Sequence, residues 1–479
     1  MKNFLSIIIF SIFLVLFSSC KWGKTDNDEK INYHYDLKRI LESGKLRVAV
    51  DYNSTSYFVY KGRPMGFQYE LLQELAKEMN VQLEIVVSNN MEETFRGLRR
   101  KKYDLIAKNL TVTKPRAENI EFTAPLMQVR QVLVQRKPEN YRQMSAISIE
   151  NHLIRNQLKL AGKTIHVQNN TSHYHRMMHL SDEIGEDITI RQDSIYGVEQ
   201  LVAMVAKGEI DFTVCDENVA WVNQTYYPNL DVKTPVSFPQ NIAWAVRKGS
   251  PGWLEYLNAW IVNFSATPKF RVIYQKYFEN SRSRQMVHND YHSLKGRFSE
   301  FDEMIKEESE GSGFDWRLIA AIIYQESQFD PEAQSWAGAY GLMQLLPETA
   351  DMYQINNIED PRMNVRAGIK NMIWLDGQLA PEIPAPDERM KFILAAYNVG
   401  LGHVIDARRL AKKYGKDPSK WDDNVDYFIL NKSAARYYKD KDVKWGYCRG
   451  EEPYNYVKNV ISIYMHYKNA IPEPADSAL

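Results

Sequence analysis

Apolar residues recur at two different spacings along the chain. Between residues 44 and 280, short segments that resemble strands, such as 46–50 and 163–167, alternate with longer segments whose apolar residues lie three or four positions apart. Strand–helix–strand order of this kind predicts parallel sheets joined by right-handed crossovers. The pattern occurs twice, at 46–107 and at 163–214. We therefore expect two α/β lobes with a cleft between them, the usual place for a small ligand.

Beyond residue 297 the helical spacing dominates, and almost no segment alternates at the period of a strand. Helices are expected at 316–327, 341–353, 361–379, 387–397, 401–414 and 456–468. The sequence thus predicts a multidomain fold, in which a two-lobed α/β module is followed by an all-α domain.

The expected boundaries follow from these patterns and from the polar stretches between them. They are a signal peptide at 1–20, a tether at 21–43, a first lobe at 44–137 and 241–280, a second lobe at 138–240, a linker at 281–297, the all-α domain at 298–470 and a tail at 471–479.

Charge and composition narrow the classes of function. The 60 basic and 60 acidic residues balance, which argues against a nucleic-acid partner, because such proteins normally carry a basic excess. Tyr (29) and Trp (10) are plentiful. Aromatic rings of this number suit surfaces that stack on sugars, although ordinary packing is an equal explanation.

The N-terminus has the features of an export signal. Lys2 precedes an apolar run at 4–17, and Ser18-Ser19-Cys20 follows. Cysteine after small residues resembles the lipobox of bacterial lipoproteins, which implies a lipid on Cys20 and a place in the cell envelope. Lys21 is not the Asp associated with inner-membrane retention, and this favours the periplasmic face of the outer membrane. A plain signal peptide or an uncleaved anchor is the alternative.

The remaining cysteines, Cys215 and Cys448, fall in different expected domains and are predicted to be buried thiols. Neither a cysteine–histidine spacing typical of zinc nor a phosphate- or dinucleotide-binding motif occurs. We therefore expect no metal and no cofactor.

One carboxylate stands out in the all-α region. Glu326 is near the end of the apolar segment 316–327, over Ile322 and Ile323 on the same helix face. Lost hydration and the negative end of the helix dipole both raise the pKa of a carboxyl group there, as a general acid requires. Pro331 should stop the helix. A solvated or paired carboxylate remains the alternative from this segment alone.

The motifs around Glu326 carry a resemblance. Glu326-Ser327, Ser335, the run 338–344 (Gly-Ala-Tyr-Gly-Leu-Met-Gln) and the run 395–400 (Ala-Ala-Tyr-Asn-Val-Gly) follow one another as in the lysozyme-like lytic transglycosylases. The resemblance implies that Glu326 protonates the oxygen between N-acetylmuramic acid and N-acetylglucosamine. It would then deprotonate the muramoyl C6 hydroxyl, leaving a 1,6-anhydro ring without using water.

The same resemblance implies substrate-binding roles for seven residues: Ser327, Ser335, Met343, Gln344, Tyr397, Asn398 and Tyr456. Met343 could instead fill the core, and Ser327 could tie down a helix end. Tyr456 follows a long insertion at 412–453, whose aromatic residues could line the groove or cover it.

Ordinary glycosidases use two carboxylates, and a second one is not obvious here. Asp330 is expected in a turn or cap, and Glu348, Asp351 and Asp360 lie in polar surroundings. A single acid/base therefore fits better. A water-using muramidase and a non-catalytic sensor or transport receptor are the rival interpretations.

The two-lobed module carries a second resemblance. The runs 66–71, 110–116 and 122–125 are similar to those of the family 3 extracellular solute-binding domains, which have the periplasmic-binding-protein fold. This implies that Arg116 grips a ligand carboxylate, with Thr111, Thr171 and Ser172 assisting, and that Asp216 meets the ligand amine. A surface role for Arg116 and a helix-cap role for Asp216 are the alternatives.

Together, the two halves resemble the membrane-bound lytic murein transglycosylase F family. This implies a peptidoglycan-cleaving enzyme whose N-terminal module binds a regulatory muropeptide or amino acid. Its expected partners are glycan strands and, through the lipid anchor, a membrane.

Overall fold

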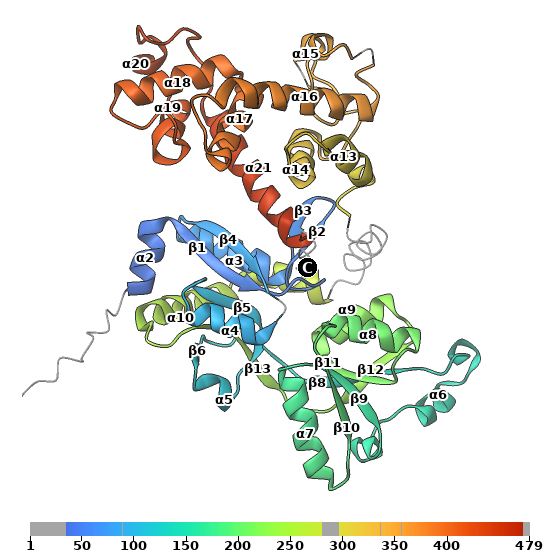
Figure 1. Cartoon of the computed structure of the whole chain (residues 1–479). Coiled ribbons are helices and arrows are strands. Elements are labelled where there is room, and N and C mark those ends of the chain that lie inside the picture. The colour runs from blue at the N-terminus through green and yellow to red at the C-terminus, as the bar shows by residue number, and fades with distance from the viewer. Residues whose placement is uncertain (1–34, 89, 280–296, 336, 356, 473–479) are drawn as a thin grey trace, which may run out of the picture.

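The computed structural model describes residues 35–88, 90–279, 297–335, 337–355 and 357–472. It contains two lobes, each built on a sheet, and a helical domain (Figure 1). The expected signal peptide, Cys20, most of the tether and linker, and the tail from 473 lie outside the described residues.

The sheet of the first lobe has the strand order β4-β1-β5-β13-β6, with β7 also paired to β13. Its strands are β1 (Lys45–Val50), β4 (Gln82–Val87), β5 (Leu105–Thr111), β6 (Ile120–Phe122), β7 (Met127–Val129) and β13 (Gln240–Arg247). β1 pairs in parallel with β4 and β5, as the strand–helix–strand pattern predicts, whereas the returning β13 is antiparallel. Around the sheet lie α2 (Tyr35–Ser43), α3 (Phe67–Glu78), α4 (Met91–Arg99), α5 (Lys114–Ala117), α10 (Pro251–Ser265) and α11 (Pro268–Tyr274).

The sheet of the second lobe has the order β10-β9-β11-β8-β12. It comprises β8 (Gln131–Arg136), β9 (Thr164–Gln168), β10 (Thr189–Asp193), β11 (Phe212–Asp216) and β12 (Leu230–Pro235), with α6 (Ala146–His152), α7 (Ser172–Ile184), α8 (Val198–Lys207) and α9 (Glu217–Tyr226). Cys215 is fully buried in this lobe, and Cys448 is buried in the helical domain.

Two expected boundaries are wrong. The first lobe does not extend to residue 137, because β8 pairs with β11 and β12 in the second sheet. The tether does not reach residue 43, because α2 is folded onto the first lobe: Asp36 is buried and forms a 2.8 Å ion pair with Arg247 of β13.

The helical domain is built around α14 (Trp316–Ser327), which is buried from Arg317 to Ile323. Asp315 caps its start by accepting a hydrogen bond from the backbone N of Arg317. Its end is set by Gln328, which has a left-handed backbone conformation, so the helix stops before Pro331. The other helices are α13 (Asp302–Ser309), α15 (Pro347–Met352), α16 (Pro361–Leu379), α17 (Pro386–Val399), α18 (Leu401–Lys413), α19 (Asp426–Leu430), α20 (Ala435–Tyr438) and α21 (Glu451–Ala470).

The helix expected at 341–353 is shorter than predicted. Residues before α15 form a tight loop in which Gly338 and Gly341 have φ of 83° and 80°. Glycine adopts these angles without the steric cost of a side chain, and they are incompatible with a helix. The loop brings the backbone of Tyr340 against that of Leu345.

The insertion at 412–453 is an integral part of this domain. Lys432 and Asp406, both fully buried, form a 2.8 Å ion pair. The backbone N atoms of Lys444 and Trp445 also donate to Asp406. Trp421 is buried, and its ring packs edge-on against that of Phe392.

Helix α21 connects the helical domain to the first lobe, and Figure 1 shows it running down to β2 (Phe58–Tyr60) and β3 (Arg63–Met65). His466, near its end, is 5% exposed; its Nδ1 lies 2.7 Å from the hydroxyl of Tyr57 and its Nε2 lies 3.3 Å from that of Tyr69. Val59 of β2 is buried in the core of the helical domain. No helix in the described ranges is both long and apolar enough to cross a membrane.

Candidate functional site

Glu326 occupies the last turn of α14, half-buried, and is held by α21. The hydroxyl of Tyr456 donates a 2.7 Å hydrogen bond to its Oε1. Burial raises the pKa of Glu326 to about 7; the Tyr456 bond acts against this rise, and the charge of Glu452 adds to it. The carboxyl group is therefore close to half-protonated at neutral pH, as the apolar pattern of α14 predicts.

The loop after α14 supports this end of the helix. Ser327 Oγ donates to the carbonyl oxygens of Ile323 and Leu342, which ties the helix to the loop. The hydroxyl of Tyr397, on α17, donates to the carbonyl oxygen of Met343 at 2.8 Å. Burial raises the pKa of both Tyr397 and Tyr456, and the charge of Glu326 adds to the rise, so the three side chains lie within electrostatic reach of one another.

Several of the expected substrate-binding side chains are engaged inside the protein. Met343 is fully buried, and a Cβ on Gly368 would collide with its sulfur, so it is packed as a core residue. Gln344 Nε2 donates to the carbonyl oxygens of Ala333 and Gly341. Ser335 Oγ accepts from the backbone N of Ala339.

Other expected positions remain partly accessible. Asn398, on the last turn of α17, is partly exposed. The Tyr397 side chain, also on α17, is partly accessible as well, although its hydroxyl is already bonded.

The other candidate carboxylates are bonded within a turn or a helix cap, or are exposed. Asp330 accepts from the backbone N of Glu332 in a turn, and Asp360 caps α16 by accepting from the backbone N of Met363. Glu348 and Asp351 are exposed on α15. Glu452, which the sequence did not suggest, acts on the pKa of Glu326; its position one turn before Tyr456 is the signal that could have identified it.

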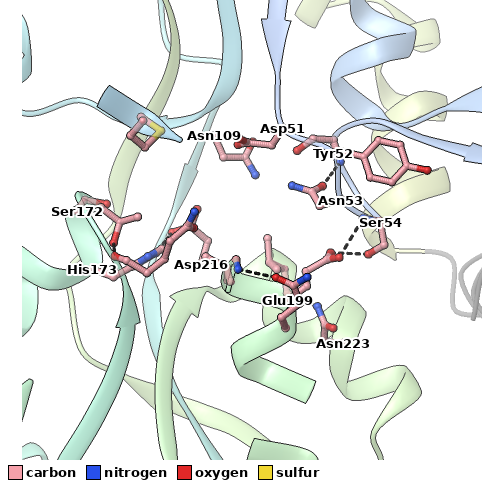
Figure 2. A pocket seen from close by; sticks show the side chains of 18 of the residues that line it. Asp51, Tyr52, Asn53, Ser54, Asn109, Ser172, His173, Glu199, Asp216 and Asn223 are labelled. Carbon is pink, nitrogen blue, oxygen red and sulfur yellow. Dashed lines mark hydrogen bonds and ion pairs between the residues drawn. The ribbon is translucent and has the colours of Figure 1, made fainter. Parts of the chain in front are cut away.

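A cavity of about 480 Å³ separates the two lobes, and Figure 2 shows its polar lining. Four of the five expected ligand-binding residues line it: Arg116, Thr171, Ser172 and Asp216. The fifth, Thr111, is buried behind the wall, where its Oγ1 lies 3.0 Å from Ser172 Oγ in the opposite lobe. The structure thus brings the five residues together.

Arg116 and Asp216 carry the charges expected for an amino-acid ligand. Arg116 Nη1 donates to the carbonyl oxygen of Thr111 at 3.1 Å. Burial lowers the pKa of its guanidinium, and the charge of Asp216 acts in the opposite direction. Asp216 occupies the N-cap position of α9 but makes no capping hydrogen bond with its side chain; its Oδ1 lies 3.3 Å from His173 Nε2 instead.

Sequence reasoning missed part of the lining. Asp51, Asn53 and Ser54 follow β1, whereas Glu199 lies in the first turn of α8 in the other lobe. Ser54 donates to Glu199 from its backbone N (3.1 Å) and its Oγ (2.5 Å), so the lobes are bonded across the cleft. The position of 51–54 directly after a parallel strand is the signal that could have found them.

No group of three or more His, Cys, Asp or Glu side chains arranged to hold a metal occurs among the residues described. The expected lack of a cofactor remains a prediction.

Comparison with known proteins defines the class. Residues 46–280 match the bacterial extracellular solute-binding proteins, family 3, and residues 303–420 match the transglycosylase SLT domain. The chain therefore combines a solute-binding α/β module with a lytic transglycosylase catalytic domain. Helix α21, which supplies Tyr456, lies beyond the matched part of that domain.

Whole-chain relatives give the family. The membrane-bound lytic murein transglycosylase F of Desulfosudis oleivorans is 33% identical over 443 residues, covering 91% of this chain and 94% of that protein. The protein of the same name from Photobacterium profundum is 30% identical over 468 residues, covering 96% and 86%. The chain belongs to the membrane-bound lytic murein transglycosylase F family, which confirms the resemblance found in its motifs.

Among solved structures, the P235GK mutant of ArgBP from T. maritima is 25% identical, with a TM-score of 0.44, and covers 51% of this chain and 100% of that one.

Proposed function

We propose that the chain cleaves the β-1,4 bond between N-acetylmuramic acid and N-acetylglucosamine in murein, with Glu326 as its one acid/base. The observation that carries the proposal is the state of Glu326: a half-buried carboxyl with a pKa of about 7, oriented by Tyr456. A group with this pKa can give up a proton and take one back at neutral pH.

Each step follows from that state. Protonated Glu326 donates to the bridging oxygen as the glycosidic bond breaks. The substrate's own acetamido group stabilises the developing cation, because the other candidate carboxylates are engaged in turns and caps or exposed. Glu326, now ionised, removes the proton of the muramoyl C6 hydroxyl, which closes the 1,6-anhydro ring. Tyr456 holds the carboxylate in place throughout, and Asn398, which follows Tyr397 on α17, is partly exposed and available to the sugar.

The test is mass spectrometry of the products released from purified murein by the wild type and by Glu326→Gln. Anhydro-muropeptides from the wild type alone support the proposal. Reducing ends would indicate a hydrolase and a second carboxylate, and a lack of product from both proteins would favour a non-catalytic receptor.

For the cleft, we propose that the α/β module binds an amino acid or a muropeptide through Arg116 and Asp216, and that binding alters the rate at Glu326. A guanidinium pairs with a carboxylate in bidentate geometry. Helix α21 connects the catalytic site to the first lobe, because it carries both Tyr456 at Glu326 and His466 at Tyr57. Calorimetry with stem peptides and amino acids tests the binding, with Arg116→Ala expected to abolish it.

We also propose a location in the cell envelope, with a lipid on Cys20 anchoring the protein to the periplasmic face of the outer membrane. Mass spectrometry of the mature N-terminus tests this proposal. Cys20→Ala should release the protein from the membrane fraction.

A further inference from the structure

The charges that line the cleft do not balance. Three carboxylates, Asp51, Glu199 and Asp216, face it, against one guanidinium, that of Arg116. Two of the carboxylates have cationic or imidazole neighbours. Asp51 lies 3.0 Å from the fully buried Lys108, and Asp216 has His173 beside it and attracts Arg116. Glu199 is the carboxylate of the three for which no such neighbour is found among the described residues.

Glu199 has hydrogen-bond donors but no counter-charge. Its two oxygens accept from the backbone N and the Oγ of Ser54, and none of the ion pairs among the described residues includes it. Burial raises its pKa, against the effect of the two Ser54 bonds. A carboxylate withdrawn from water without a cation is unfavourable, and a cation placed beside it relieves that cost.

The space beside Glu199 belongs to the ligand cavity. Its volume, about 480 Å³, lies within the range of pockets that hold small molecules. Glu199 enters from the first turn of α8, and Arg116 enters from α5 in the opposite lobe. His173, 7% exposed in the same wall, has no hydrogen-bond partner at its Nδ1.

We propose that Glu199, presented by Ser54, is a subsite for a second cationic group of the ligand. The cleft would then select a diamino acid, free or within a short peptide. Its carboxylate would lie on Arg116, one ammonium near Asp216 and the other on Glu199. The inference rests on the proposed binding function of the α/β module and adds the residue that decides specificity.

The test is calorimetry on the full-length protein with pairs of ligands that differ in one charge. L-lysine is compared with L-norleucine, and L-alanyl-L-lysine with L-alanyl-L-norleucine, so that a free amino acid and a peptide-borne residue are distinguished. The wild type should bind the lysine member of at least one pair ten times or more tighter. Glu199→Gln keeps the shape and one of the two acceptors for Ser54, and should remove that preference while leaving norleucine affinity unchanged.

Two controls separate this inference from the function on which it rests. Glu209→Gln removes a charge from an exposed position just after α8, and should leave the preference intact. Arg116→Ala should abolish the binding of every ligand. Equal wild-type affinity for both members of each pair, with binding that still depends on Arg116, would overturn the Glu199 subsite alone. A preference that survives in Glu199→Gln would do the same, and no binding of any ligand would overturn both proposals.

Discussion

The hydroxyl of Tyr456 donates a 2.7 Å hydrogen bond to Oε1 of Glu326, across 130 positions of sequence. The bond stabilises the ionised carboxylate and so holds the pKa of Glu326 below the value that burial alone would give. Tyr456→Phe should therefore shift the alkaline limb of the pH–rate profile upward. It should also lower turnover at least about tenfold, since a hydrogen bond to a charged group contributes roughly 1.5–3 kcal/mol.

The measurement is the rate of release of soluble muropeptides against pH. Tyr454→Phe, on the same helix, is the matched control and should behave as the wild type. An unchanged profile for Tyr456→Phe would show that the bond has no part in the reaction.

For the wild type, the proposed acid step sets the direction of the pH dependence. Glu326 must start protonated, and its pKa is about 7. Activity should therefore hold below that pH and fall about tenfold for each pH unit above it. A rate that rises through pH 8 would exclude Glu326 as the acid.

The charge of Glu452 raises the pKa of Glu326. Glu452→Gln should lower that pKa and move the alkaline limb to lower pH. Because Glu452 is exposed and solvent screens its charge, the shift should be about half a pH unit or less. Glu451→Gln, its exposed neighbour, is the control, and a shift of the same size there would make the effect non-specific.

His466 should make stability depend on pH. Burial lowers its pKa to about 4, from an ordinary value near 6.5. Between those values the unfolded chain binds more protons than the folded one. The stabilisation from neutral His466 is therefore complete above about pH 6.5 and is lost as the pH falls towards 4, by roughly 3 kcal/mol at most.

Denaturant unfolding at pH 7 and pH 4.5 measures the effect. His466→Asn should be less stable at neutral pH but should lose less stability on acidification. An equal loss in the variant and the wild type would contradict the assignment.

Gly62, between β2 and β3, lies where a side chain does not fit. A Cβ there would come within 2.5 Å of Tyr324 and the Tyr467 hydroxyl, and φ is 76°. Gly62→Ala should reduce the free energy of unfolding by about 1–3 kcal/mol and lower activity, because Tyr324 is on the helix of Glu326. Gly311→Ala is the control, since its φ is 72° but nothing lies within 4 Å of a Cβ there. Equal losses in both variants would assign the effect to backbone strain alone.

The local pattern of apolar residues was sufficient to predict the raised pKa of Glu326, but not the contact between the two lobes. The raised pKa of Glu326 follows from the apolar residues one turn before it, which are close in sequence. The bond from Ser54 to Glu199 joins residues 145 positions apart and depends on how two lobes close. The periodicity of apolar residues in the sequence does not predict how the two lobes close.

The wrong lobe boundary and the wrong helix length have the same origin: each depends on contacts between residues that are distant in sequence or on the packed loop. β8 has a short apolar run at Val132–Val134, but this run does not say which sheet the strand joins, because that depends on its partners β11 and β12. The helix predicted at 341–353 is shortened to α15 because Gly338 and Gly341 adopt backbone angles that only the packed loop requires. Tyr456 was identified by family resemblance, because its position after the insertion gives no local signal.

The placement of Val59 has a consequence for how the protein can be divided. This residue belongs to the first lobe by sequence and to the core of the helical domain by packing. Separating the two halves at the linker would expose that apolar contact on both sides and leave His466 without Tyr57 and Tyr69. The halves are thus expected to melt in one cooperative transition, so that damage to the catalytic half also costs the cell its ligand-binding half.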